Sequence, residues 1–588
     1  MFLIAAALES ENSGVDARRW QVLVDRTRKR STFDGMMFSS SRCRLFIVPT
    51  RLFDREILQG WRAAAMRSWD FFQMTLGSLP KLRFGAGLID VAKTECTFND
   101  TVLASDGERT LMYRGVTSSD RLCYALTPDG LYIASSEQPL LEALGSDSAA
   151  TSFNNDYLAC YLAALPPPPD ATIHAAIGQV TTGNRLLVRH HHLTRLAPVS
   201  PRPRSGAHRI GDLEALATLR QLIDQSVATK ARNGYRVGLS LSGGLDSSAL
   251  AASYARLKAP DSPEAVACSY SFPSHAIADE AARSRALAEH FNMPHHLFDA
   301  EPHLPLRGTA FEGSPDRPDA SPYRAIRLAQ LELLRAEGVD LCLDGSFGDD
   351  AFRFDDRRVL VDLIKSRRLD LLANYLPPGK RDAARFIARQ AKGLAGLIRG
   401  SRGPSRTRWL SRVWRQQVLQ IWEEQIRHWK HFPSPQLALS CFGPLAATAG
   451  ANDAHHNAST GVDFAFPFFD AELLSFLLSL PNHCSYRHGQ WKWALRESQR
   501  GLLPDWCRLH PKSADLTPVF LANVVARRSQ WEHHDRHATL LFSDFLADDL
   551  TESTIEQMRR DRLLGLWQRV QLHRWLISRD VRQVADAL

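Results

Sequence analysis

The hydrophobic positions of this chain follow two different patterns. Up to about residue 200, short apolar runs such as Met1–Leu8, Cys43–Val48 and Leu131–Ala134 are separated by turn residues, which predicts short β-strands. Beyond residue 206, apolar runs alternate with longer helical patterns. This alternation predicts βαβ units, and therefore an α/β fold with a parallel sheet and helices on both of its faces.

The first region also contains two predicted helices, Glu137–Leu144 and Phe153–Leu165. The second ends at Pro166–Pro169, because consecutive prolines cannot continue a helix. Leu186–Arg189 is expected to be the last strand before a segment rich in proline and arginine. We therefore expect two domains, a β-rich one over residues 1–205 and an α/β one over residues 206–588.

The second region predicts a strand at Arg236–Leu241, then a helix over Ala249–Leu257. Ala265–Phe272 is apolar enough for a buried parallel strand and is followed by a helix at Ala281–Phe291. Val339–Leu343 is expected to be the third strand. In sheets of this kind, ligands bind beyond the carboxyl ends of the strands.

A serine- and glycine-rich segment joins the first of these strands to its helix. It reads Ser242, Gly243, Gly244, Leu245, Asp246, Ser247, Ser248, and we call it the serine loop. Glycines let the backbone approach a ligand, and a helix N-terminus with serine hydroxyls suits a phosphate. Asp246 could hold a metal ion against that phosphate. The alternative is a plain glycine turn; a Walker motif is excluded because its Gly-Lys-Ser/Thr ending is missing.

A second loop, which we call the acidic loop, follows Val339–Leu343 and runs from Asp344 to Asp350. Carboxylates at neighbouring strand ends suit Mg²⁺, which binds oxygen ligands while bridging phosphates. Asp246 and Asp349 are the predicted metal pair. A simple acidic turn is the alternative.

Composition limits the class of protein. With 588 residues, 44% hydrophobic and 23% charged, the chain resembles soluble globular proteins of two or three domains. We find no apolar run long enough for a bilayer, and Met1–Leu8 lacks the basic segment of a signal peptide. Nine dispersed cysteines without a C-x-x-C pair predict reduced thiols in the cytoplasm. A net charge of +8 fits a nucleotide substrate without requiring nucleic acid.

Two features left alternatives open. Arginines between Arg399 and Arg415, with Trp409 and Trp414 among them, could bind RNA or an acidic peptide, or form a solvated helix face. His190–His192 could suggest a metal site, but no further ligands stand at suitable spacing, so we favour a strand end or turn.

The serine loop resembles the pyrophosphate loop of ATP pyrophosphatases, and the order of segments resembles the asparagine-synthetase family. Three further stretches carry this resemblance. Gly345, Gly348 and Asp349 fit its second signature, with Phe347 in place of a small residue. Gly461–Asp470 keeps Pro467, Phe468 and Asp470, and Gly489–Arg496 keeps Lys492 and Arg496.

The resemblance implies an Ntn-glutaminase-like first domain, whose nucleophile is a cysteine at position 2. This chain has Phe2, so we expect a degenerate domain without glutaminase activity. By the same resemblance, Leu241 and Tyr270–Phe272 should border the adenine of ATP, and Mg²⁺ is the implied metal.

Three residues are the predicted catalytic candidates. Lys492 would stabilise charge in the transition state. Ser346 stands where asparagine synthetases carry a glutamate, and Asp463 replaces the glutamate of the third motif, so these two are candidates for the base. The alternative to a catalytic Lys492 is a lysine that is simply exposed on the surface. The alternative to a catalytic Asp463 is a buried aromatic turn that only packs.

Within the family, β-lactam synthetases and lasso-peptide isopeptide cyclases use the amine of their own substrate. The Asp344-Gly345 opening and the divergent first domain most resemble a lasso-peptide cyclase. This implies a precursor peptide as substrate, with a leader-peptide protease and a leader-binding protein as partners. Another amide synthetase acting on a small amine, and a tRNA-modifying ATP pyrophosphatase, remain alternatives.

Overall fold

The computed structural model describes the backbone of most of the chain. The described residues are 2–9, 16–28, 36–39, 43–49, 72–76, 101–105, 109–118, 121–145, 152–189, 191–199, 211–231, 235–258, 264–307, 316–318, 321–352, 363–364, 367, 369–398, 407–427, 437–438, 441, 460–480, 484–511, 516–546 and 560–585. In this part of the chain, no helix is both long enough and apolar enough to cross a membrane.

The N-terminal region consists of two antiparallel sheets, as its short apolar runs predicted. The first has the order β2-β3-β1-β8-β7-β9 and the second β11-β10-β6-β5-β4. Their strands are β1 Phe2–Glu9, β2 Met36–Ser39, β3 Cys43–Pro49, β4 Phe72–Leu76, β5 Thr101–Ser105, β6 Arg109–Arg114, β7 Cys123–Thr127, β8 Gly130–Ala134, β9 Gly178–Gln179, β10 Arg185–Arg189 and β11 His192–Leu196.

Three helices accompany these sheets, α1 (Ala17–Arg28), α3 (Glu137–Leu144) and α5 (Asn155–Leu162). The strands near residues 2, 43, 131 and 186 and the helix at residue 137 are confirmed, and the helix expected from residue 153 begins two residues later. The expectation that Leu186–Arg189 is the last strand is wrong. β10 turns back at His191, which has a φ of 63°, and pairs with β11. His191 and His192 are exposed in that hairpin, as the turn interpretation predicted, while His190 lies outside the described residues.

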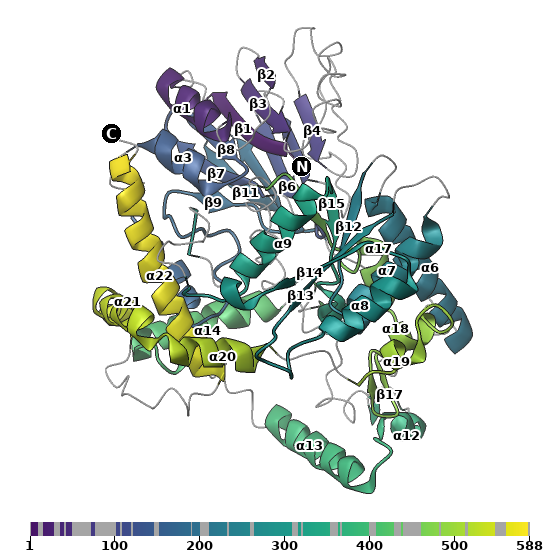
Figure 1. The fold of residues 1–588 in the computed structure, drawn as a ribbon. Helices are drawn as coiled ribbons and strands as arrows, with labels where there is room; N and C mark the ends of the chain where they lie inside the picture. The colour runs from purple at the N-terminus through teal and green to yellow at the C-terminus, as the bar shows by residue number, and fades with distance from the viewer. Residues whose placement is uncertain are drawn as a thin grey trace.

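The C-terminal region is built on a parallel five-stranded sheet in the order β14-β13-β12-β15-β16. Its strands are β12 (Val237–Ser240), β13 (Val266–Ser271), β14 (His295–Asp299), β15 (Leu341–Leu343) and β16 (Asp463–Ala465). Helices α7 (Leu245–Leu257) and α8 (Ala281–His290) lie on one side of the sheet and α9 (Arg324–Ala336) on the other (Figure 1). The predicted α/β class is confirmed.

Two strands of this sheet differ from the prediction. β14 had no predicted counterpart, because its sequence His-His-Leu-Phe-Asp is polar at both ends, so Val339–Leu343 contains the fourth strand along the chain and not the third. β16 lies in the stretch Gly461–Asp470, for which no strand was predicted and a buried aromatic turn was the alternative. It forms an edge of the sheet instead.

The other helices surround this sheet and its connections. They are α6 Asp212–Lys230, α10 Gly348–Ala351, α12 Leu372–Tyr375, α13 Lys380–Ile398, α14 Arg412–Arg427, α17 Ala471–Leu477, α18 Trp493–Ser498, α19 Asp505–Arg508, α20 Thr517–Ala526, α21 Arg528–Leu541 and α22 Arg560–Ala585. A hairpin of β17 (Tyr486–Arg487) and β18 (Gln490–Trp491) precedes α18. Asp470 caps α17, because its Oδ1 accepts the backbone N–H groups of Glu472 and Leu473.

The two regions share a buried core. Residues of α5, including Leu158 and Leu162, pack with Trp409, Val418 and Trp575 of the C-terminal region. The Trp409 indole donates to the Leu162 carbonyl oxygen at 2.9 Å. This packing joins the first region to the second.

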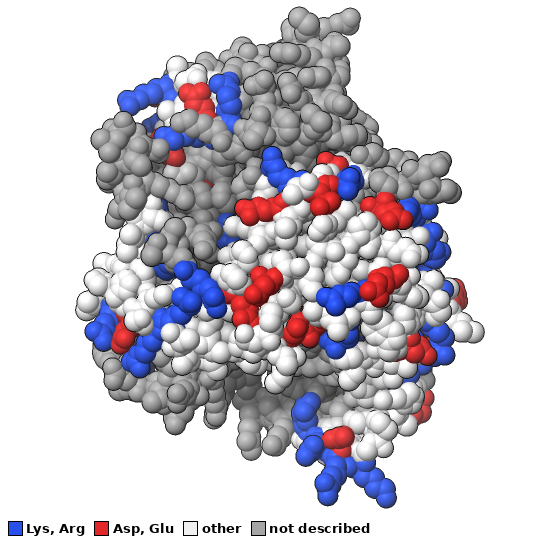
Figure 2. Space-filling model, viewed as in Figure 1, with Lys and Arg blue, Asp and Glu red and all other residues white. Residues whose placement is uncertain are grey.

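The same contacts bear on the basic segment near residue 400. Trp409 is buried, and Trp414 stacks on Phe545 at 4.7 Å, so neither ring is free to stack on a base. Arg408 and Arg412 are exposed, while Arg399 and Arg402 lie outside the described residues. On the face drawn in Figure 2, Lys and Arg side chains are interspersed with Asp and Glu. A solvated helix face is the interpretation that fits.

Candidate active site

The serine loop and the acidic loop lie next to each other. β12 stands between β13 and β15, so the loop that follows β12 and the loop that follows β15 leave the sheet at the same edge. The order of the strands along the chain reverses here, because β13 and β14 extend to one side and β15 and β16 to the other. A parallel sheet opens a ligand crevice at such a switch point.

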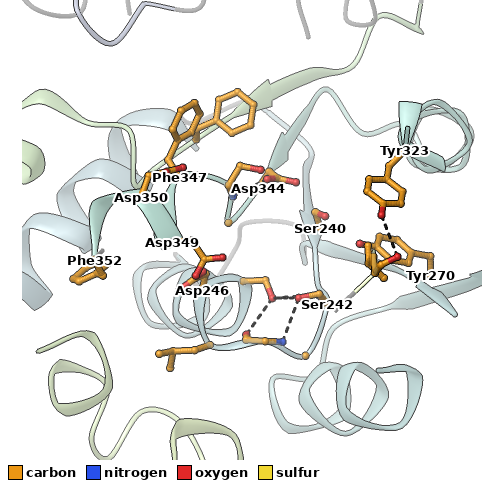
Figure 3. A pocket seen from close by; sticks show the side chains of 18 of the residues that line it. Ser240, Ser242, Asp246, Tyr270, Tyr323, Asp344, Phe347, Asp349, Asp350 and Phe352 are labelled. Atoms are coloured by element: carbon orange, nitrogen blue, oxygen red, sulfur yellow. Dashed lines mark hydrogen bonds between the residues drawn. The ribbon is translucent and has the colours of Figure 1, made fainter. Parts of the chain in front are cut away.

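The serine loop is braced by its own hydroxyl groups (Figure 3). The Ser242 N–H donates to Ser247 Oγ at 3.2 Å, and the Gly244 N–H donates to Ser242 Oγ at 3.2 Å. Gly243 has a φ of 80°, and a Cβ there would lie 2.9 Å from Arg283 Cβ, so glycine is required for both reasons. Helix α7 begins within this segment, at Leu245, so the segment directs the N-terminus of a 13-residue helix toward the crevice.

The acidic loop approaches the serine loop so closely that two glycines are needed. A Cβ on Gly345 would lie 2.9 Å from the Ser247 backbone nitrogen, and one on Gly348 would lie 2.5 Å from Asp246 Cγ. Phe347 between them has a φ of 68°, which is unfavourable for a residue with a bulky side chain. Its ring stacks on Phe469 with centroids 4.3 Å apart, which helps to hold this conformation.

Lys492 joins the two loops. Its Nζ lies 2.5 Å from Asp246 Oδ2 and 2.6 Å from Asp349 Oδ1. Lys492 precedes α18 and has a φ of 56°, and its side chain is 16% exposed, so it is not a surface lysine. Figure 3 shows Asp349 of the acidic loop close to Asp246 of the serine loop.

Lys492, Asp246 and Asp349 form a charged trio in which burial and neighbouring charges have opposite effects on the pKa values of Lys492 and Asp246. Burial by itself would lower the pKa of Lys492, but the carboxylates of Asp246 and Asp349 outweigh it, so that pKa is raised. Burial raises the pKa of Asp246, and the Lys492 ammonium only partly offsets it. The trio therefore depends on the lysine for its charge balance.

The residues present fit a divalent cation. Asp246 Oδ1 is buried and has no hydrogen-bond partner among the described residues, so one carboxylate oxygen remains to be satisfied. Among these residues no group of three or more His, Cys, Asp and Glu side chains could hold a metal ion. Mg²⁺ is commonly bound by one or two carboxylates together with substrate phosphates, and this donor set has that character.

Helix α9 supplies polar side chains that the sequence reasoning missed. Arg327 Nη1 lies 2.9 Å from Asp344 Oδ2, and Gln330 donates to Ser240 Oγ at 3.1 Å. Although burial alone would raise the pKa of Asp344, Arg327 and the Ser346 N–H keep it below its usual range. Arg324, Arg327 and Gln330 are spaced three residues apart, which could have indicated one helix face, but not which surface that face meets.

These elements enclose a cavity of about 1130 Å³. The predicted site residues that line it are Ser242, Gly243, Gly244, Asp246, Ser247, Tyr270, Gly345, Ser346, Asp349 and Lys492. The lining residues that the sequence reasoning did not assign to the site include Tyr323, Arg324, Arg327, Gln330, Trp491 and His510. Figure 3 shows Tyr270 and Tyr323 across the cavity from Asp246 and Asp349.

Five predicted residues do not line this cavity. Ser271 and Phe272, which were expected to border the adenine together with Tyr270, are not part of its lining, and Phe272 is fully buried. The Leu241 N–H donates to the Cys268 carbonyl at 3.0 Å, so its backbone belongs to the sheet. Ser248 is fully buried, and its hydroxyl donates to the Gly244 carbonyl at 2.6 Å, so it braces the helix from behind. Asp463 begins β16 opposite Leu341, the first residue of β15, at the end of the strands that faces away from the acidic loop. Periodicity and motif spacing do not show which surface a side chain faces or at which end of a strand a residue lies.

Several solved structures are similar to this chain, and two of them illustrate how low the similarity is. One is the U34-tRNA thiolase NcsA from Methanococcus maripaludis with its [4Fe-4S] cluster, at 16% identity over 41% of this chain and 85% of that one, with a TM-score of 0.21. The other is glutamine phosphoribosylpyrophosphate amidotransferase from B. subtilis with ADP and GMP. It is 8% identical over 62% of this chain and 79% of that one, with a TM-score of 0.17. No curated protein matches the chain.

The match to a protein family is extensive. The family described as asparagine synthase matches residues 218–577, which is more than half of the chain and contains both loops and Lys492. Members of that family use ATP to form amide bonds. The chain therefore belongs to the asparagine synthase family and is an ATP-dependent, amide-forming ligase.

Proposed function

We propose that this enzyme closes a macrolactam ring in a lasso-peptide precursor. It would adenylate an Asp or Glu side chain of the peptide and let the peptide's own N-terminal amine attack the acyl-adenylate. The products would be an isopeptide bond, AMP and pyrophosphate. The proposal rests on the amide-forming family and on one further observation, the similarity of the Asp344-Gly345 opening to lasso-peptide cyclases.

The source of the amine is part of the same proposal. Phe2 begins strand β1 and pairs with Pro49 of β3, and a phenyl ring cannot attack glutamine. A substrate that carries its own amine needs no ammonia from a glutaminase. The similarity of the Asp344-Gly345 opening to lasso-peptide cyclases favours a peptide as that substrate.

The cavity supports such a reaction through the placement of its charged groups. The N–H groups and hydroxyls of the serine loop would bind the phosphates of ATP, with Tyr270 near the base. A magnesium ion held by Asp246 and Asp349 would neutralise phosphate charge. Lys492, in contact with both carboxylates, would stabilise the negative charge that develops as the adenylate forms and breaks down.

Ser346 remains a candidate for handling the proton of the attacking amine. It lines the cavity, and its N–H donates to Asp344 Oδ1 at 2.8 Å, which orients the residue. Asp463 no longer qualifies, because it lies outside the cavity lining. Much of the rate enhancement would come from holding amine and carbonyl together, which can contribute about 7–11 kcal/mol in well-oriented reactions.

The proposal includes partners. A ring-closing amine at the peptide N-terminus must first be released from a leader, so we propose a leader-peptide protease and a leader-binding protein as associates. Sequencing the neighbourhood of the gene for a short precursor reading frame and a small cysteine protease is a rapid check.

The decisive test is ATP–pyrophosphate exchange with different carboxylates. Exchange that depends on a precursor core peptide, with loss of one water mass from the peptide by mass spectrometry, is the expected result. Exchange with aspartate and ammonia or with a small β-amino acid, and none with peptide, would replace this proposal by a small-molecule synthetase. Salt-sensitive RNA binding with RNA-dependent AMP release would point to a tRNA-modifying enzyme.

A further inference from the structure

The Lys492 ammonium and a divalent cation depend on the same two carboxylates. Lys492 Nζ lies 2.5 Å from Asp246 Oδ2 and 2.6 Å from Asp349 Oδ1. One singly charged group thus lies against both residues of the proposed magnesium pair. Two positive ions cannot share so small a site without strong mutual repulsion.

The backbone holds the lysine in this position. Lys492 has a left-handed conformation, with φ 56° and ψ 37°, at the point where hairpin β17–β18 meets α18. Arg496 fixes the start of that helix, because its Nε donates to the Trp491 carbonyl at 2.8 Å. A conformation that is unfavourable for lysine, supported by its neighbours, indicates a position that the fold requires.

The two carboxylates differ in what else they could bind. Asp246 is hemmed in by the acidic loop, since a Cβ on Gly348 would meet its carboxyl group, and its Oδ1 has no hydrogen-bond partner among the described residues. The side chain of Asp349 is 83% exposed and can turn toward the cavity. The pair can therefore accept a cation, but only if the ammonium moves away from the carboxylates.

We propose that Lys492 is an internal counter-ion that competes with the divalent cation for Asp246 and Asp349. Nucleotide phosphate would attract the ammonium and add cation ligands of its own, so that the cation binds tightly only together with the nucleotide. This coupling would keep the site from filling with metal alone. The inference rests on the proposed assignment of Asp246 and Asp349 as cation ligands.

Binding of Mn²⁺ to the nucleotide-free protein, followed by electron paramagnetic resonance, tests the inference without any catalysis. We expect Lys492→Met to bind Mn²⁺ at least about tenfold more tightly than the unmodified protein, because a positive charge next to both ligands is removed. Lys492→Arg, which keeps the charge, should remain weak. Lys380→Met removes the same charge from the exposed start of α13 and should change nothing.

Further variants and measurements distinguish this inference from the proposed function. The double variant Lys492→Met, Asp246→Asn should lose the added Mn²⁺ affinity, and α,β-methylene-ATP should increase Mn²⁺ affinity more in the unmodified protein than in Lys492→Met. Equal Mn²⁺ affinity of the unmodified protein and Lys492→Met, or full affinity in the double variant, would overturn the inference. Failure of peptide-dependent exchange with the Mn²⁺ results intact would reject the peptide substrate alone. Near-ultraviolet circular dichroism verifies that each variant is folded.

Discussion

The N-terminal and C-terminal regions bury charged groups in opposite ways. In the N-terminal region, Arg121 and Glu137 are almost completely buried and pair with each other at 2.7 Å. In the C-terminal region, Asp246 and Lys492 pair beside a cavity. Glu137 Oε2 and Asp246 Oδ1 both lack a hydrogen-bond partner among the described residues, so the difference between the pairs is the cavity. Charges enclosed by protein stabilise an arrangement, whereas charges beside a cavity remain available to a ligand. We therefore propose that the first region is a scaffold and that the second carries the chemistry.

The buried charges of the N-terminal region also hold the two regions together. Arg121 Nη1 lies 3.5 Å from Asp316 Oδ2, and the Gln138 N–H donates to Asp316 Oδ1 at 2.9 Å. Asp316 belongs to the connection between β14 and α9, and α9 lines the cavity. The scaffold therefore supports one wall of the active site at a distance.

The largest expected effect comes from removing the cation of the buried network. Arg121→Met should lower the free energy of unfolding by about 3–5 kcal/mol, because it removes a buried cation that lies against the buried carboxylates of Glu137 and Asp316. Urea unfolding followed by intrinsic fluorescence measures it. Arg185→Met, which removes a partly exposed arginine of β10, is the matched control and should cost less than about 1 kcal/mol. Equal stability of the two variants would contradict the scaffold role.

The converse experiment changes activity and not stability. Asp246→Asn should reduce AMP release about 10²- to 10³-fold while the unfolding curve stays close to that of the unmodified protein, because it removes charge beside a cavity. Steady-state AMP release under saturating ATP is the measurement. Asp382→Asn on exposed α13 serves as the control. AMP release at an unchanged rate in Asp246→Asn would defeat the assignment of the site.

A smaller effect is expected from closing the gap between the two loops. Gly348→Ala places a methyl group 2.5 Å from Asp246 Cγ, so the carboxylate must move, while the backbone of α10 tolerates alanine. A displacement of about 1 Å at a catalytic group can reduce kcat about 100-fold. Gly211→Ala meets no atom within 4 Å and should leave kcat unchanged. If Gly348→Ala kept full activity, the close approach of the loops would have no role in catalysis.

The smallest effect concerns the pH dependence of the shared core. His174 packs near Phe153 and Trp575, with ring centroids 6.3 and 6.1 Å away, and burial together with Arg579 lowers its pKa to about 4, against the opposing effect of Asp316. A lowered folded-state pKa means that stability is fully present above pH 6.5 and is lost as the pH falls toward 4. Between pH 8 and pH 5 the loss amounts to about 2 kcal/mol.

His174→Phe should remove this part of the pH dependence, since a phenyl ring fits the aromatic cluster and carries no titrating group. Thermal unfolding at pH 8 and pH 5 measures the difference. His192→Gln in exposed β11 should keep the slope of the unmodified protein. An identical slope in His174→Phe would show that other groups control the acid stability of the core.

The site was predictable where one continuous segment carries the signal. The serine loop and the acidic loop could be identified because each carries its polar side chains directly after an apolar strand. Lys492 could be identified because the stretch Gly489–Arg496 resembles a motif of the family. Arg327 and Gln330 could not be identified in this way. They reach the cavity from a helix whose face toward the sheet depends on how the helix crosses it.

Ser248 and Asp463 show the converse case: the sequence predicted them at the site, but they do not line the cavity. Ser248 belongs to the motif, yet one residue of helical rotation beyond Ser247 turns its hydroxyl back to Gly244. Asp463 matches a motif position, yet the parallel register with β15 places it at the wrong end of its strand. Membership in a motif does not determine the direction of a side chain.

The sequence alone determined the α/β class of the second region, the β-rich pattern of the first, and the two loops that follow β12 and β15, because strand periodicity and glycine positions are local properties. Only the tertiary structure decided that β12 and β15 are neighbours, that Lys492 bridges Asp246 and Asp349, and that Arg121 joins the two regions. Those contacts join residues more than 100 positions apart, and strand order, helix crossing and shared burial bring them together.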